Sequence, residues 1–213
     1  MRADVFVLLD DVQFPKKGGT WMNRARMLVG GEARWLTVPV DRAYSGTRPV
    51  CEMRIDESKP WRDHMLATIR SSYMRAPFVD EILPTVEEAL AAPTDRIAEL
   101  NEGAIRLLAS RLAVDASKLV RQSELGVSGH GTELLINLCR AVGGDVYLSG
   151  DGSDGYLERD AFGTAELGLA FQEFAPPSYP QAVPGYVPGL SVVDALMSCG
   201  WAGTAELIRK ERS

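Results

Sequence analysis

The side chains best suited to chemistry begin at Asp10 and Asp11, which end an apolar run, DVFVLLD, and start the loop DDVQFPKKGGTWMNR. The same loop carries further polar and aromatic side chains: Gln13, Trp21, Asn23 and Arg24. Such a loop after a buried strand is typical of a binding surface. A guanidinium binds a carboxylate or phosphate through two parallel hydrogen bonds, and an indole stacks on a flat ring. The loop is therefore predicted to bind substrate, and a solvated charged loop anchored by its tryptophan is the alternative.

His64 is the first candidate for a general base. It lies in a segment of helical spacing, near Trp61 and Asp63. Histidine is the usual proton acceptor near neutral pH. The same pattern also suits a packed, hydrogen-bonded histidine without a catalytic role. His130, in SGHGT at a predicted helix start, is a weaker candidate.

A glycine pattern, G-x-G-x-x-G, occurs at Gly150, Gly152 and Gly155 after the strand-like run DVYLS. This is the dinucleotide-binding fingerprint. Asp151 and Asp154, however, place two carboxylates where a pyrophosphate would lie, and like charges at close range repel. The loop also lacks the glycine and glutamate spacing of an EF-hand. We expect no dinucleotide here; the loop is either a tight turn or one wall of a substrate site.

No metal or other cofactor is expected. The chain has two histidines and neither a C-x-x-C nor an H-x-x-x-H pattern, so the usual spacings of transition-metal ligands are missing. Its cysteines, Cys51, Cys139 and Cys199, are odd in number and widely separated. That pattern predicts reduced structural thiols and a cytoplasmic protein.

The elements that must position these residues follow from hydrophobic spacing. DVFVLLD is predicted to be a strand buried on both faces. ARMLV and ARWLTVPV flank Gly30-Gly31 and predict a hairpin, with a further short strand at Val50–Ile55. Three helices follow in the 57–114 segment. The first is capped by Asp56 or Ser58, the second spans residues 78–91, and the third follows Thr94-Asp95.

From Lys118 onward strands and helices alternate: KLVRQSEL, GTELLINLCRAVG, DVYLS, GYLERDAFGTAEL and LAFQEF. Alternation of this kind favours parallel pairing with crossover helices. A proline-rich stretch then leads to a last helix capped by Ser191. The predicted fold class is α/β, with a mixed, mostly parallel sheet, flanking helices and an inserted helical segment. We expect a single domain over residues 1–213 with a possible helical subdomain at 57–114.

Composition narrows the functional class. The 213 residues are 46% hydrophobic and 24% charged, with a net charge of −6. A chain with this net negative charge lacks the overall positive charge that is typical of nucleic-acid-binding proteins. No apolar run approaches the roughly 18 residues that span a bilayer, so neither a nucleic-acid nor a membrane partner is expected.

Several segments together resemble the WbqC-like protein family. They include LLDDVQFPKKGGTWMNR, RWLTVPV, WRDHMLATIRSSYMRAPF, RQSEL, TELLINLCRAVGGDVYLSGDGSDGYL and FQEFAPPSYPQ. They occur in family order along nearly the whole chain. By this resemblance we expect the chain to begin at the family's second strand, without its usual N-terminal strand. By matching position, the family's recurrent polar residues fall on Asp10, Asp11, Gln13, Asn23, Arg24, His64, Ser149, Tyr156, Tyr179, Gln181 and Asp194.

The resemblance implies a role in O-antigen or other polysaccharide biosynthesis, with transfer of glycine or a related group. We therefore expect an aminoacyl- or acyl-transferase that acts on an amino group of a sugar or small metabolite. Its small-molecule partners would be an activated donor and an amine acceptor. A carrier protein that presents the donor is a further candidate partner. His64 would be the base, assisted by Asp10 or Asp11, and the substrate would meet Gln13, Trp21, Asn23, Arg24, Ser149, Tyr156, Tyr179 and Gln181. The alternatives are an ATP-dependent amide-forming enzyme and a non-catalytic binding protein of a sugar pathway.

Overall fold

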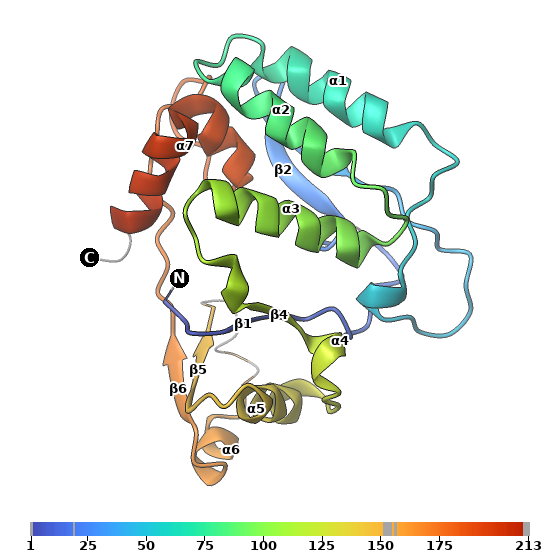
Figure 1. Ribbon diagram of the computed structural model, residues 1–213, viewed down its shortest axis with the longest axis vertical. Helices are drawn as coiled ribbons and strands as arrows, with labels where there is room; N and C mark the ends of the chain where they lie inside the picture. The colour runs from blue at the N-terminus through green and yellow to red at the C-terminus, as the bar shows by residue number, and fades with distance from the viewer. Residues whose placement is uncertain (1, 19, 151–154, 156, 211–213) are drawn as a thin grey trace. The chain divides into compact units, whose positions relative to one another are not determined.

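The computed structural model describes residues 2–18, 20–150, 155 and 157–210 (Figure 1). The chain divides into two compact units. The first combines Met1–Asp11 with Ser117–Ala175, and the second combines Val12–Ala116 with Pro176–Ser213. The segment 57–114, expected to be helical, lies within the second unit.

The first unit contains two parallel strand pairs. β1 (Phe6–Leu8) pairs with β4 (Leu119–Arg121), and β5 (Val146–Ser149) pairs with β6 (Gly168–Phe171). Its helices are α4 (Gln122–Leu125), α5 (Gly131–Ala141) and α6 (Arg159–Thr164), and the 3-10 helix η2 (Ala116–Lys118) precedes β4. These strands and helices alternate as predicted.

Apolar side chains from α5, α6 and β5 form the core of this unit. Ile136, Leu157 and Phe162 are buried together. Tyr147 stacks on Phe162 with the ring centroids 5.5 Å apart. Apolar residues at helical spacing on α5 therefore face the β5–β6 pair, as the alternation of strands and helices requires.

Two predictions for this unit were wrong. β1 is not buried on both faces, since Phe6 is 50% exposed; among the described strands it pairs only with β4. KLVRQSEL is not one strand, because the chain turns at Gln122 into the short helix α4. Gln122 is buried there.

The second unit begins with the hairpin of β2 (Arg24–Val29) and β3 (Glu32–Thr37), which confirms the prediction. Arg24 lies opposite Thr37, and Val29 opposite Glu32. The turn glycines have positive φ angles, 62° at Gly30 and 84° at Gly31. A two-residue hairpin turn of type I′ needs such angles at both positions, which glycine adopts without strain.

Four helices complete the second unit: α1 (Trp61–Tyr73), α2 (Val79–Leu90), α3 (Ile97–Arg111) and α7 (Val192–Lys210). α2 packs against α1, α3 and α7 (Figure 1). The Oγ of Ser191 accepts a hydrogen bond from the N–H of Val193, so the predicted cap of the last helix is confirmed. The predicted caps of α1 are wrong, because that helix begins after Pro60 with no side-chain cap, and the N–H of Ser58 bonds to Asp56 instead.

The strand predicted at Val50–Ile55 is also wrong. Val50–Glu52 forms the 3-10 helix η1, and beyond it only isolated bridges pair Arg54 and Ile55 with other segments. Val50 and Met53 are both buried. Burial three residues apart matches the period of a 3-10 turn, not the alternation of a strand.

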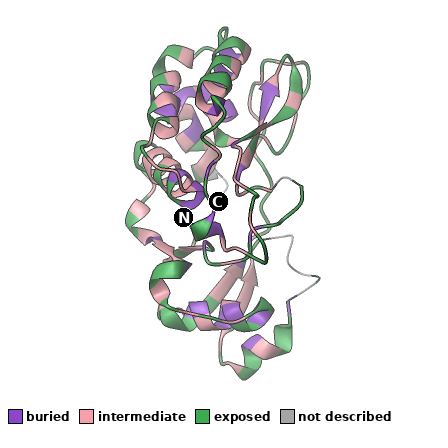
Figure 2. Cartoon of the chain, turned by 90° about the vertical axis from the view of Figure 1, so that its right-hand side faces the viewer, coloured by how far each residue is buried: buried purple, intermediate pink, exposed green. Residues whose placement is uncertain are grey.

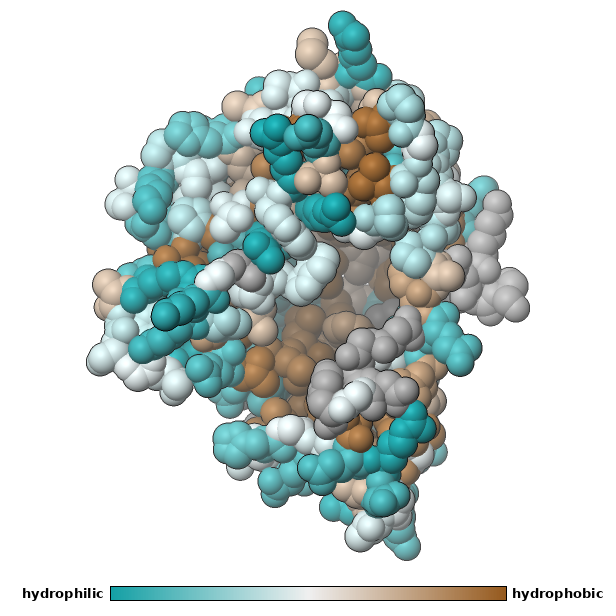
Figure 3. Space-filling model, turned by 180° about the vertical axis from the view of Figure 1, so that it is seen from behind, coloured by the Kyte–Doolittle hydropathy of each residue, from teal (hydrophilic) through white to brown (hydrophobic). Residues whose placement is uncertain are grey.

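Two clusters of buried side chains hold the second unit together. One surrounds Phe14, Met53 and Ile97, and the other joins Met27 and Leu28 of the hairpin to Leu196 and other residues of the helices. In Figure 2 the buried segments alternate with exposed ones along the helices and strands. On the face drawn in Figure 3, hydrophobic patches interrupt a mostly hydrophilic surface. The predicted mixed α/β class is confirmed, with parallel pairs in one unit and an antiparallel hairpin in the other.

Candidate functional site

A pocket of about 390 Å³ opens in the second unit between the hairpin and the helices. β2, β3, α1, α2, α3 and the start of α7 all contribute residues to its lining. Apart from Asn23, Arg24, Asn101 and Ser191, the lining is aliphatic or aromatic. A concave, mostly apolar site of this size with a few polar groups is the usual form of a small-molecule site.

Two indole rings and a guanidinium lie together where β2 begins. The rings of Trp21 and Trp35 meet edge to face with centroids 4.9 Å apart, and the Arg24 guanidinium carbon lies 4.1 Å from the Trp35 centroid. Trp21 is 74% exposed, and both it and Arg24 line the pocket. The predicted binding residues Trp21 and Arg24 are therefore brought together.

Arg24 has an unusual feature. Its Nε is buried and has no hydrogen-bond partner among the described residues. A buried N–H that bonds to nothing costs roughly 1–3 kcal/mol, more when it carries charge. An acceptor oxygen from a ligand would remove this cost, so Arg24 is the polar group in the lining best placed to meet one.

The side-chain amides of the two asparagines in the pocket already donate hydrogen bonds to backbone carbonyls. Asn23 is 4% exposed, and its Nδ2 donates to the carbonyl of Val38 at 3.0 Å. The Nδ2 of Asn101 on α3 donates to the carbonyl of Met22 at 2.6 Å. These bonds tie the 20–23 loop to Val38, the residue after β3, and to α3. They fix the Trp21–Arg24 edge of the pocket.

His64 lies in the first turn of α1, and its side chain is exposed. The imidazole has no hydrogen-bond or ion-pair partner within the described part of the chain. It is therefore not a packed, hydrogen-bonded histidine. His64 is not among the residues that line the pocket.

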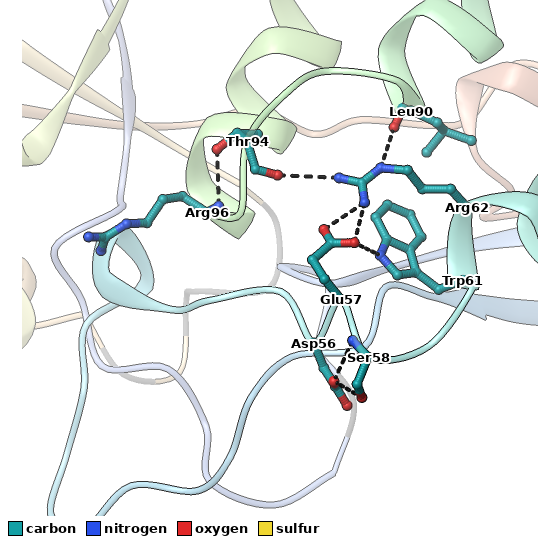
Figure 4. A network of polar contacts seen from close by, with 8 residues as sticks. All are labelled: Asp56, Glu57, Ser58, Trp61, Arg62, Leu90, Thr94 and Arg96. Atoms are coloured by element: carbon teal, nitrogen blue, oxygen red, sulfur yellow. Dashed lines mark hydrogen bonds and ion pairs between the residues drawn. The ribbon is translucent and has the colours of Figure 1, made fainter.

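A polar network fixes the start of the helix that carries His64 (Figure 4). Arg62 donates to Glu57 at 2.6 Å, to the carbonyl of Leu90 at 2.9 Å and to the carbonyl of Thr94 at 3.2 Å. The Nε1 of Trp61 donates to the same glutamate at 3.3 Å. The start of α1 is thus joined to the end of α2 and to the segment before α3.

The remaining predicted site residues of the first unit are Asp10, Asp11 and Ser149. Both carboxylate oxygens of Asp10 accept hydrogen bonds from Ser123, one from its N–H at 2.9 Å and one from its Oγ at 2.6 Å. Asp10 is buried and holds the start of α4, whereas Asp11 is exposed. Ser149 is buried at the end of β5. Tyr156, with most of the glycine loop, lies outside the described residues.

Gln13, Tyr179 and Gln181 belong to the second unit with His64. Gln13 is exposed and bridges Pro49 through its backbone. The amide of Gln181 closes a loop, since its Nε2 donates to the carbonyl of Val187 and its Oε1 accepts from the N–H of the same residue. None of the three lines the pocket. Their role in binding stays a prediction.

Tyr179 takes part in a buried cluster around Asp194, which is 1% exposed. The hydroxyls of Tyr73 and Tyr179 donate to its two carboxylate oxygens at 2.6 and 2.8 Å. The Tyr73 oxygen also accepts from the N–H of Leu28 at 3.1 Å. Burial, followed by the bond to Asp194, raises the pKa of Tyr73, and burial is the largest cause of the raised pKa of Tyr179.

Several features of the site were not predicted from the sequence. Trp35 and Tyr73 were assigned to a strand and a helix without a role at a site. The aliphatic residues of the pocket, such as Ile69 and Leu108, have the helical spacing of ordinary core residues. Nothing in a single sequence distinguishes a core position that is filled from one that lines a pocket.

One comparison with known proteins identifies a family. The model of the WbqC-like protein family matches residues 1–206. An uncharacterized protein of Mycobacterium tuberculosis is 25% identical over 200 residues, which cover 93% of this chain and 85% of that protein. No solved structure matches. In the described part of the chain no helix has the length and apolarity to cross a membrane, and no group of three or more potential ligands could hold a metal ion.

Proposed function

The chain belongs to the WbqC-like protein family, and from that premise we propose that it transfers an acyl or aminoacyl group to an amine. The acceptor would be an amino sugar or a comparable small metabolite of polysaccharide or related biosynthesis. The observation that carries the proposal is the apolar pocket of the second unit, with Arg24 in its lining. An acyl group needs an enclosing, mostly apolar site, and its carbonyl oxygen needs a hydrogen-bond donor.

The chemistry of the reaction assigns roles to the polar residues. The amine nitrogen attacks the carbonyl carbon of an activated donor, and the bond to the leaving group breaks with its electron pair. Negative charge builds on the carbonyl oxygen in between, and a nearby guanidinium stabilises that charge. Arg24, whose buried Nε lacks a partner among the described residues, suits this role.

A base must remove the proton that the amine loses. We assign this role to His64, because its imidazole is exposed and has no partner within the described part of the chain. Asp10 and Asp11, the other predicted catalytic residues, belong to the first unit, and their role stays a prediction. Asp10 already accepts two hydrogen bonds from Ser123, and Asp11 is exposed.

We further propose a cytoplasmic location, where activated donors are made, and a carrier protein as one source of the donor. None of the described cysteines forms a disulfide, which suits a reducing compartment. A carrier would present the acyl group on a flexible arm, and the exposed Trp21 in the pocket lining offers a surface that such an arm could meet.

A second candidate is a binding protein without catalysis. One observation favours it: His64, Asp10 and Asp11, the predicted catalytic residues, are all absent from the pocket lining. Such a protein would bind the same ligands and turn over none of them. The two functions therefore differ in a single measurable property.

The test is a transfer assay with purified protein. Thioester and acyl-phosphate donors are incubated with amino sugars, and the acceptor is followed by mass spectrometry for the added group. The proposal expects amide product that depends on the protein, without release of pyrophosphate from ATP. Product that requires ATP would identify the amide-forming alternative instead. Ligand binding with no product from any donor would identify the binding protein.

A further inference from the structure

The lining of the pocket narrows the chemical class of the transferred group. We infer that this group is an apolar acyl chain of medium length, bound with its carbonyl or carboxylate oxygen at Arg24, and not an aminoacyl group. The inference rests on the proposed function, because it names the donor of the same site. It differs from the glycine transfer that the family resemblance implies.

Size is the first argument. The pocket has a volume of about 390 Å³ and receives residues from six elements. A glycyl group would leave most of this volume without contacts, and contacts with the lining supply the affinity. Each methylene that an acyl chain buries against Met27, Ile69 or Leu108 strengthens binding about four-fold. A chain of about eight carbons uses the pocket far better than a chain of two.

Charge is the second argument. The lining contains the guanidinium of Arg24 but no aspartate or glutamate. The α-ammonium of an aminoacyl group would therefore enter an apolar site with a cation near it and no counter-ion. Burying an unpaired ammonium is costly. An acyl group without the ammonium avoids this cost and keeps the oxygen that Arg24 can bind.

The third argument is the state of Arg24 itself. Its guanidinium is held on the ring of Trp35 at 4.1 Å, and its buried Nε has no partner among the described residues. Asn23 and Asn101, its polar neighbours in the lining, already donate to backbone carbonyls. Ser191, the fourth polar residue of the lining, offers only a neutral hydroxyl that already accepts from the N–H of Val193. The charged donor that can meet a ligand oxygen is thus Arg24, which lies next to the exposed Trp21. The chain of the ligand extends from there between the hairpin and α3.

Isothermal titration with simple carboxylates tests this assignment. Octanoate is expected to bind about 15-fold more tightly than hexanoate, since it buries two more methylenes. 4-Methylpentanoate and leucine share one carbon skeleton and differ by the ammonium. The first is expected to bind at least about 10-fold more tightly. Equal affinity for this pair, or tighter binding of leucine, would overturn the inference.

Variants locate the binding site. Ala104→Phe places a large ring in the lining from α3 and is expected to abolish octanoate binding. Ala202→Phe makes the same change at an exposed position of α7 outside the pocket, and should bind as the wild type does. If Ala104→Phe fails to fold, Val192→Trp fills the pocket from α7. If either variant folds and still binds octanoate with wild-type affinity, the assignment of the ligand to this pocket is contradicted.

A comparison of a carboxylate with an alcohol of the same chain length tests the role of Arg24. Octanoate should bind more tightly than 1-octanol to the wild type, and Arg24→Met should remove that preference while it retains binding of the alcohol. The transfer assay stays separate from these titrations. Transfer of glycine without binding of octanoate would keep the proposed function and refute this ligand class. Binding of octanoate without transfer would support the ligand class and refute the proposed function.

Discussion

The hydroxyl oxygen of Tyr73 lies 2.6 Å from a carboxylate oxygen of Asp194, although the two residues are 121 positions apart in the sequence. The same hydroxyl accepts a hydrogen bond from the N–H of Leu28. One side chain thus joins α1 to α7 and to β2, the elements around the pocket. The pocket depends on this junction, because Ile69 of α1 and Val193 of α7 both line it.

Tyr73→Phe is expected to lower the free energy of unfolding by about 1–3 kcal/mol, because it removes one donor from a buried carboxylate and the acceptor of a buried N–H. Urea denaturation measures the change. Tyr186→Phe is the matched control, since that exposed hydroxyl donates to the carbonyl of Pro177 at the surface. Its cost should stay within about 0.5 kcal/mol. Equal losses in the two variants would refute the importance of the junction.

Alkaline pH should weaken the same junction. The pKa of Tyr73 is raised above its usual value of 10.0, and that of Tyr179 is raised as well. The folded chain therefore keeps protons that the unfolded chain releases, so this stability is fully present below pH 10 and is lost as the pH rises through the folded-state pKa. Each tyrosine adds a slope of at most about 1.4 kcal/mol per pH unit.

Denaturation between about pH 9 and pH 11 measures this slope, since free tyrosine titrates near pH 10. Tyr73→Phe should show a shallower decline than the wild type, because one titrating group is gone. A wild-type stability that stays level or rises across this range would contradict the prediction.

Gly200→Ala is expected to destabilise the protein by at least about 2 kcal/mol, from backbone strain and steric overlap together. Gly200 lies at the kink of α7 with φ 66° and ψ −176°, a conformation that only glycine adopts readily. An added Cβ would lie 2.7 Å from the Cδ1 of Phe78. Gly103→Ala in α3 meets nothing within 4 Å, and should instead stabilise by about 0.5–1 kcal/mol. Thermal unfolding of the two variants measures these changes in stability, which should have opposite signs.

Arg24→Met should leave the free energy of unfolding within about 1 kcal/mol of the wild type. The substitution removes a buried N–H that has no partner in the described residues, and this removal stabilises the folded state. It also removes the contact of the guanidinium with the Trp35 ring, and this loss destabilises the folded state. Arg34→Met, at an exposed ion pair with Glu32, is the control. A loss above about 2 kcal/mol would mean that Arg24 supports the fold and not a ligand.

His64→Ala is expected to reduce transfer at least about 100-fold with unchanged stability, since a general base contributes on the order of 100-fold or more. The histidine is exposed, so its removal disturbs no packing. His130, the other histidine of the chain, is exposed at the start of α5. The control variant His130→Ala should therefore retain full activity. Full turnover by a folded His64→Ala protein would remove the base assignment.

Much of the secondary structure could be predicted from local pattern. The hairpin followed from two β-prone runs around Gly30-Gly31, and α1, α2 and α3 from apolar residues at helical spacing. The errors occurred where burial had to be known. Val50–Glu52 forms a 3-10 helix, with both Val50 and Met53 buried, and Phe6 is exposed although β1 pairs with β4.

The sequence by itself determined the family, the alternation of helices and strands, and the polar residues around Trp21 and Arg24. Those properties depend on residue type and spacing, which a single chain displays. Only the tertiary structure decided which of these residues meet a pocket. Burial and hydrogen bonding depend on segments far apart in the chain: Asn101 fixes the loop at Met22, Ser123 occupies Asp10, and Asp194 holds Tyr73. The orphaned Nε of Arg24 likewise exists only once the surrounding segments have packed.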